Sequence, residues 1–125
     1  MCYPCSVIIN GYDIGPGAEL ALAQIPGANL AGANLAGANL NAANLAGANL
    51  AGANLSGANL SLADLNGANL SGANLSGANL AFTDLRQANL RRATLTNAIN
   101  FGKSPGYLLG ANLTGATGPD GTVLN

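Results

Sequence analysis

Residues 27–60 read GANLAGANLAGANLNAANLAGANLAGANLSGANL. The same five-residue unit continues on both sides, so that sixteen pentads follow one another without a gap from Ala18 to Asn97. The central residue of each pentad is Leu in fifteen of the sixteen, with Ile25 the exception. The residue two places before it is Ala in fifteen, with Thr83 the exception, and the residue between them is usually Asn. An internal repeat of this regularity decides the whole architecture.

A period of five fits neither an α-helix nor a flat strand. On a helix, successive central leucines would drift by about 140° and cover every side. On a strand, an odd period would put alternate leucines on opposite faces. The leucines share one interior only if the chain bends once in every pentad. Four bends of about 90° close a square coil, and successive coils then stack about 4.8 Å apart.

A second period supports this coil independently. We call the residue two places after the central one the corner residue. It is Gly in nine of the pentads between residues 27 and 77. Side chains replace it every twenty residues, at Leu22, Ala42, Leu62 and Phe82. Twenty residues are four pentads, so the sequence predicts four pentads per coil. Residues 18–97 would form about four regular coils, followed by a fifth, irregular one.

The role of each pentad position follows from the coil. The central Leu points inward and stacks on its equivalent one coil away, as with Leu30, Leu50 and Leu70. The Ala two places before it also points inward, because the narrow tube has room only for a methyl group there. Gly at the corner permits backbone angles that a β-carbon opposes. The Asn lies on the outer wall, where it can hydrogen-bond locally or from coil to coil.

The pentads of the form Ala-Asn/Asp-Leu-x-x resemble the pentapeptide-repeat family. This resemblance implies an all-β fold, a right-handed quadrilateral β-helix with a water-free interior. The ending Gly115-Ala116-Thr117-Gly118-Pro119-Asp120-Gly121-Thr122-Val123 is similar to the tail after such arrays in many cyanobacterial members. The chain is therefore identified as resembling a cyanobacterial-type member.

The whole chain, 1–125, is expected to form a single domain with shielded ends. Residues 1–17 would be an N-terminal cap, in which Asn10-Gly11 between two apolar runs predicts a hairpin. After Asn97 the pentad frame breaks and returns three residues out of phase at Leu108 and Leu113. This shift predicts a corner loop over 102–105 within an irregular coil spanning 98–117, followed by a short tail over 118–125.

The composition argues against catalysis. The chain has no His, so a His general base, a Ser-His-Asp triad and His metal ligation are excluded. Cys2 and Cys5 form one CxxC, but zinc requires four ligands and a redox pair requires a thioredoxin-like setting. We expect this pair to be inert or incidentally oxidised, with a disulfide or an intermolecular zinc site as the alternatives. The sequence predicts no enzyme, no cofactor and no metal site.

The few charged residues suggest two clusters. Asp64 and Asp84 are twenty residues apart, so they should stack on adjacent coils, with Arg86 and Arg91 near enough to offset their repulsion. This arrangement predicts a surface charge cluster, and a metal-binding or catalytic carboxylate pair is the alternative. All basic residues fall near the C-terminal end and form a candidate basic patch: Arg86, Arg91, Arg92 and Lys103.

Four apolar corner residues predict an interaction stripe along one edge: Leu22, Ala42, Leu62 and Phe82. Corner residues face outward in the family that the chain resembles. The stripe could be covered by the N-terminal segment or by the loop near Lys103, could mediate self-association, or could bind another protein.

The leading hypothesis for function is a non-catalytic structural or interaction solenoid that presents neutral faces to a protein partner or to a second copy, as a homodimer. A β-solenoid that binds a ligand or an ice surface through regular ladders is the alternative. The DNA-mimicking gyrase inhibitors of the family have a strongly acidic surface, which this chain lacks. Its formal net charge of −1 predicts no nucleic-acid partner. No 18-residue apolar run and no basic N-terminal segment occur, so we expect no membrane association and a cytoplasmic location.

Overall fold

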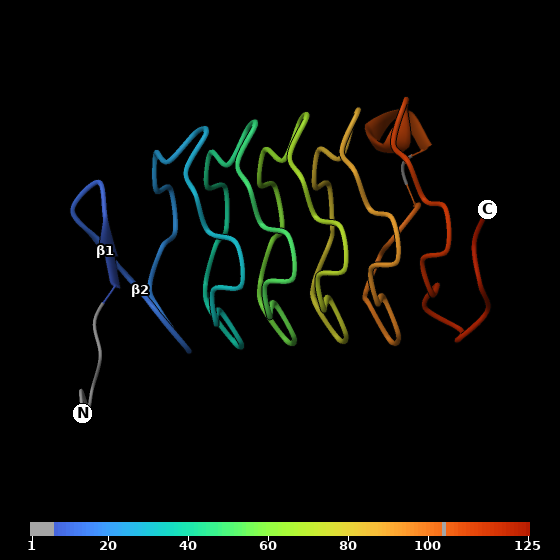
Figure 1. Cartoon of the computed structure of the whole chain (residues 1–125), viewed down its shortest axis with the longest axis horizontal. Helices are drawn as coiled ribbons and strands as arrows, with labels where there is room; N and C mark the ends of the chain where they lie inside the picture. The colour runs from blue at the N-terminus through green and yellow to red at the C-terminus, as the bar shows by residue number, and fades with distance from the viewer. Residues whose placement is uncertain (1–6, 104) are drawn as a thin grey trace.

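The computed structural model describes residues 7–103 and 105–125, which form a stack of coils with a hairpin at its N-terminal end (Figure 1). The hairpin comprises β1 (Val7–Ile9) and β2 (Tyr12–Ile14). A 3₁₀ helix, η1 (Pro105–Leu108), lies near the C-terminal end. Between them the chain runs through short bridges and turns that repeat every five residues.

Parallel bridges join residues that are twenty apart, as the two overlapping periods predict. Asn34 pairs with Asn54, and Asn54 pairs with Asn74. In each pentad, backbone groups form hydrogen bonds with the preceding coil and with the following coil. The Leu50 N–H donates to the Asn69 carbonyl at 2.7 Å, and the Asn49 N–H donates to the Ala28 carbonyl at 2.9 Å. The fold is therefore a quadrilateral β-helix with twenty residues per regular coil.

Each pentad ends in a turn that requires a positive φ at the corner residue. The Ala53 N–H donates to the Leu50 carbonyl at 3.0 Å and closes the turn around Gly52, whose φ is 66°. A β-carbon on Gly52 would meet no atom within 4 Å. The preference for Gly at this position thus arises from backbone conformation and not from crowding.

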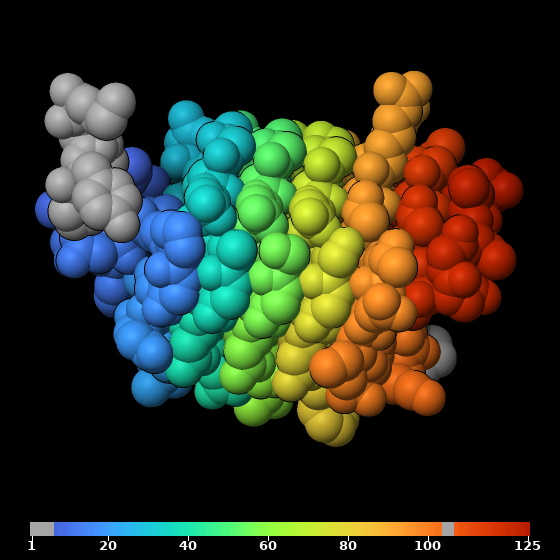
Figure 2. All heavy atoms as spheres, turned by 90° about the horizontal axis from the view of Figure 1, so that it is seen from below, coloured from blue at the N-terminus to red at the C-terminus, as the bar shows by residue number. Residues whose placement is uncertain are grey.

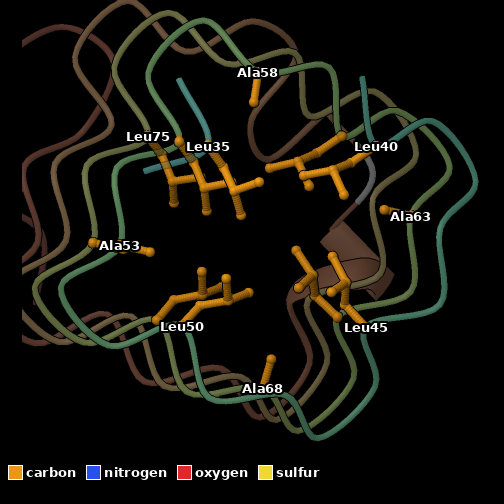
Figure 3. Close-up of a cluster of buried hydrophobic side chains, with 14 of the residues drawn as sticks. Leu35, Leu40, Leu45, Leu50, Ala53, Ala58, Ala63, Ala68 and Leu75 are labelled. Atoms are coloured by element: carbon orange, nitrogen blue, oxygen red, sulfur yellow. The ribbon is translucent and has the colours of Figure 1, made fainter. Parts of the chain in front are cut away.

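The core is the tube that the sequence predicts. The central leucines form four stacks that point into the tube, and the inner alanines lie between these stacks (Figure 3). Leu50 and Ala53 are both fully buried, as are Leu70 and Ala73 of the following coil. In the preceding coil Leu30 is buried and Ala33 is partly buried. Thr83, the one inner residue with a hydroxyl, donates from Oγ1 to the Leu60 carbonyl at 2.7 Å. Its polar group is satisfied within the tube.

The asparagines of the outer wall bond mainly within their own turn. The Asn54 Oδ1 accepts from the Ser56 N–H at 3.0 Å, and the same bond recurs along the array. Coil-to-coil amide bonds also occur near the N-terminal end, where Asn39 Nδ2 donates to Glu19 Oε2 at 3.3 Å. Of the two bonding modes left open by the sequence, the local one is the more regular.

The N-terminal hairpin is confirmed. Asn10 and Gly11 have φ values of 52° and 83°, which is the pattern of a two-residue turn with both central residues left-handed. β1 and β2 pair antiparallel, with Ile9 opposite Tyr12. Ile14 is buried, and Ile9 and Tyr12 pack against the core, so the hairpin covers part of the first coil.

The three-residue phase shift after residue 97 is also confirmed. Asn89 pairs with Asn112 and Thr94 with Thr117, so this coil has twenty-three residues instead of twenty. Leu108 and Leu113 return to the core side. The extra residues form a turn followed by η1, whereas the sequence predicted only a loop over 102–105. Ser104 lies outside the described residues.

The C-terminal segment 118–125 is more than a tail. It turns back on the last coil, where Val123 forms an antiparallel bridge with Thr117. The Leu124 N–H donates to the Ala116 carbonyl at 2.7 Å, and the Leu124 side chain packs against the core. Ala116 is fully buried. The segment therefore packs on the last coil and covers part of its core.

Candidate interaction surfaces

The apolar stripe (Leu22, Ala42, Leu62 and Phe82) lies on one edge of the square, and all four residues have positive φ values of 64°, 56°, 62° and 55°. Leu22, Leu62 and Phe82 are 69%, 60% and 60% exposed, and Ala42 is half-buried. The hairpin 7–14 and the turn around Lys103 leave Leu22, Leu62 and Phe82 largely exposed, although the extra turn lies next to Phe82. Residues 1–6 and Ser104 lie outside the described residues, so all three predicted possibilities for the stripe stay predictions.

The large exposed side chains of the stripe occupy a conformation that usually needs Gly. The other three edges have Gly at the corner through most of the array, for example Gly47, Gly52 and Gly57 with φ between 66° and 68°. Three polar residues adopt the same conformation in the last regular coil: Gln87, Arg92 and Asn97. The stripe differs from them in being apolar and in recurring at every coil.

One of the two stacked carboxylates is paired with an arginine. Asp64 and Asp84 form a bridge pair, as predicted. Arg86 binds Asp84 through two contacts, from Nη2 to Oδ2 at 2.7 Å and from Nε to Oδ1 at 2.9 Å. The side-chain hydrogen bond from Arg86 lowers the pKa of Asp84, and burial opposes this only in part. The structure assigns this role to Arg86, whereas the sequence suggested both Arg86 and Arg91.

The ion pair predicts a pH-dependent effect of Arg86 on stability. Because the folded-state pKa of Asp84 is lowered, the stabilisation is present above the unfolded pKa, about 4, and is lost as pH falls through the folded value. Arg86 is exposed, so we expect Arg86→Gln to lower the free energy of unfolding only slightly at pH 7, and not at about pH 2. Urea unfolding at pH 7 and at about pH 2 measures the difference.

Arg91→Gln is the matched control for this prediction, because it removes the same charge one pentad away. We expect it to change stability less than Arg86→Gln at pH 7. An equal loss for the two variants, or a loss from Arg86→Gln that persists at low pH, would contradict the assignment of the ion pair.

The candidate basic patch is divided between sides of the coil. Arg86 follows the central residue Leu85 and Arg91 follows Leu90, so the two lie on adjacent sides. Arg91 and Arg92 line a shallow hollow together with Ser71, Gly72 and Asn89. Lys103 is exposed in the extra turn of the long coil. Of the four cations, Arg86 is paired with Asp84, and the candidate basic patch as an interaction site stays a prediction.

The extra turn also contributes two aromatic residues that sequence reasoning did not single out, Phe101 and Tyr107. Together with Phe82 of the stripe they line one small hollow. Its volume of about 10 Å³ holds no more than one water molecule. The signal in the sequence is that Phe101 and Tyr107 come soon after the break in the pentad frame, in a chain with only 4% aromatic residues.

No group of three or more His, Cys, Asp or Glu side chains that could hold a metal ion occurs within 7–103 and 105–125. Cys2 and Cys5, and the predictions made for them, lie outside the described residues. In the part of the chain that the structure describes, no helix has the length and apolar character needed to cross a membrane. On the face in Figure 2 the coils form parallel bands without a deep hollow.

Comparison with known proteins agrees with this geometry. The family profile of pentapeptide repeats matches residues 18–61, 43–80 and 73–101, with eight copies, and so covers more than half of the chain. The chain belongs to the pentapeptide repeat family, whose members form right-handed quadrilateral β-helices. No curated protein matches the sequence.

Several solved structures are similar. A pentapeptide repeat protein from the thylakoid lumen of Arabidopsis thaliana is 37% identical, with a TM-score of 0.69 over 74% of this chain and 63% of that one. One from the cyanobacterium Cyanothece is 38% identical, with a TM-score of 0.63 over 82% and 65%. One from Nostoc is 39% identical, with a TM-score of 0.66 over 78% and 81%. The chain thus spans less than two thirds of the length of the first two.

Proposed function

We propose that this protein is a non-catalytic interaction module, a short rod that binds a partner protein through the apolar stripe. The observation that carries the proposal is the exposure of Leu22, Leu62 and Phe82 at corner positions with positive φ. A β-carbon in this conformation costs roughly 1–2 kcal/mol per residue. Side chains that are 60–69% exposed recover little of that cost by burial.

The other edges support this argument by contrast. They use Gly through most of the array, so the coil itself does not require a side chain at the corner. A residue that destabilises the fold and contributes little to the core is typical of a binding position. The large apolar side chains are suited to burial against a partner, because removal of their surface from water is favourable.

The walls beside the stripe favour a protein over a charged polymer. They consist mainly of Asn, Ala and Ser. The charged residues next to Leu62 and Phe82 are Asp64 and Asp84, and Arg86 pairs with Asp84. Such a surface offers neither the cations that bind nucleic acid nor the dense acidic charge that would mimic it. A polar rim around an apolar centre is the usual composition of a protein interface.

Leu22→Gly combined with Leu62→Gly separates binding from folding. Because Gly adopts positive φ without strain, we expect the free energy of unfolding to stay equal or to rise by up to about 1 kcal/mol per site. The interaction should be lost. Urea unfolding measures the first effect, and retention of a partner by the immobilised protein measures the second.

A photo-reactive phenylalanine analogue placed at Phe82 tests whether the stripe contacts the partner. The matched control is the same analogue at Ser76, which lies on the wall of a different side of the coil. We expect a discrete adduct from position 82 and none from position 76 in an extract of the source organism. The proposal fails if position 82 gives no adduct, or if the double glycine variant retains the same partner as the parent.

A further inference from the structure

The shallow hollow lined by Arg91 and Arg92 lies away from the stripe. Its volume is about 450 Å³, and its other lining residues are Ser71, Gly72 and Asn89. Arg92 is a corner residue, and Phe82 is the corner residue two pentads earlier. Because four pentads close a regular coil, the two residues lie at opposite corners of the square. The hollow is therefore a feature of its own.

Each side chain that lines the hollow can donate hydrogen bonds. The two guanidinium groups are always charged and have no acceptor atom. Ser71 contributes a hydroxyl group. The Oδ1 atom of Asn89 accepts from the Arg91 N–H at 3.1 Å, so the Nδ2 group of Asn89 remains as a donor. The lining thus combines two positive charges with two neutral donors, and charge-assisted hydrogen bonds from such groups stabilise an anion.

No carboxylate of the described residues neutralises these two arginines. Asp64 and Asp84 lie on the preceding side of the coil, where Asp84 is paired with Arg86. Asp120 lies over the next corner, and its Oδ1 atom accepts from the N–H and the hydroxyl of Thr122. In the part of the chain that the structure describes, neither arginine of the hollow forms an ion pair. Their charge is therefore available to a ligand.

The backbone conformation of Arg92 is a second observation that points to a ligand. Its φ is 60°, at a corner where the two preceding coils have Gly52 and Gly72 with φ of 66°. A side chain is disfavoured in this conformation, and the coil does not require one there. Gly115, the corner residue of the next coil, leaves room for the stem of Arg92, because a β-carbon at Gly115 would lie 3.4 Å from Arg92 Cγ. The chain thus holds a guanidinium group where the fold alone favours Gly.

We propose that this hollow binds a phosphate group, either as free phosphate or as the end of a small phosphate ester. A phosphate monoester carries a charge of about −1.5 to −2 at neutral pH, which matches the two arginines. The planar forks of the guanidinium groups bind phosphate oxygens in pairs. A carboxylate has one charge and two oxygens and would leave part of the donor set unused. Two arginines make fewer contacts than a nucleic-acid backbone requires, so the ligand is a small molecule.

Two variants of the full chain test the site, and each introduces the residue that stands at the equivalent position of the preceding coil. Arg92→Gly reproduces Gly72 and Arg91→Ser reproduces Ser71, so both should keep the coil intact, as circular dichroism can check. Inorganic phosphate is titrated at low ionic strength, and the Kd is measured from the amide resonances of Gly72 and Asn89. Each variant should weaken phosphate binding about tenfold or more.

Arg86→Gln is the matched control, because it removes the same charge from the adjacent side, and it should bind phosphate like the parent. Arg91→Lys keeps the charge but loses the fork, so it should bind more weakly than the parent. Glucose 6-phosphate distinguishes the source of the phosphate group, since tighter binding than inorganic phosphate indicates an ester and equal or weaker binding indicates free phosphate.

Three results would overturn the proposal. The first is a parent that binds phosphate no better than chloride. The second is parent-like binding by Arg92→Gly, Arg91→Ser or Arg91→Lys. The third is a loss from Arg86→Gln as large as that from the two variants of the hollow, which would indicate a diffuse effect of charge. None of these results depends on the binding of a partner by the stripe.

Discussion

Leu50→Asp is expected to abolish folding. Leu50 is fully buried in the tube and stacks with Leu30 and Leu70 of the adjacent coils. An unpaired carboxylate at this place has neither water nor a cation, and the penalty reaches several kcal/mol even if it is protonated. A domain of this size is stable by only about 5–15 kcal/mol in total. We expect aggregation, or loss of the cooperative thermal transition in circular dichroism.

Asn49→Asp is the matched control for this experiment. It introduces the same carboxylate one residue away on the outer wall, where Asp64 and Asp84 occur naturally and accept the same turn hydrogen bond. It should fold with nearly the parent stability. Leu50→Ala gives a measurable intermediate, with an expected loss of about 2–5 kcal/mol. A soluble Leu50→Asp protein with the parent melting temperature would refute the inward orientation of the central leucines.

Ala53→Leu is the second large effect, and it tests the width of the tube. Ala53 is fully buried on one side of the square, beside Leu50 and facing the stacks on the other sides (Figure 3). Three additional carbon atoms have no space there, so the coil must open or neighbouring leucines must leave their preferred rotamers. The expected cost is about 1–3 kcal/mol or more. Urea unfolding of the variant and the parent measures it.

Ala51→Ser is the control on the outer wall. The equivalent residue one coil further is Ser71, so the wall accepts a hydroxyl at this position. We expect no measurable change in stability. If Ala51→Ser were as damaging as Ala53→Leu, the assignment of inner and outer positions would be wrong.

The coil itself could be derived from the sequence because every regular residue has the same neighbours. The five-residue period demands one bend per pentad, and the substitutions at Leu22, Ala42, Leu62 and Phe82 set the coil length. A repeat of identical units also repeats its contacts, so local pattern and tertiary environment agree. The three-residue shift to Leu108 was visible for the same reason, as a break in an otherwise exact frame.

The sequence predicted which residues form the stripe, but not whether other segments of the chain cover them. Spacing placed the four residues on one edge, and only the fold decided that no described segment covers them. The choice of Arg86 over Arg91 as the partner of Asp84 also needed the structure. Arg86 is two residues from Asp84 on the same side of the coil, whereas Arg91 lies on the next side, and the structure shows that the nearer side chain reaches the carboxylate.

The two ends of the rod show most clearly what the sequence does not determine. The Asn10-Gly11 turn is a local signal, so the sequence by itself determined the hairpin. The return of Val123 to Thr117 and the packing of Leu124 on the core depend on a surface that exists only after the last coil has formed. Within the array each coil is covered by the next, and the repeat determines the contacts. A terminal coil has no such neighbour, and only the tertiary structure decided what covers it.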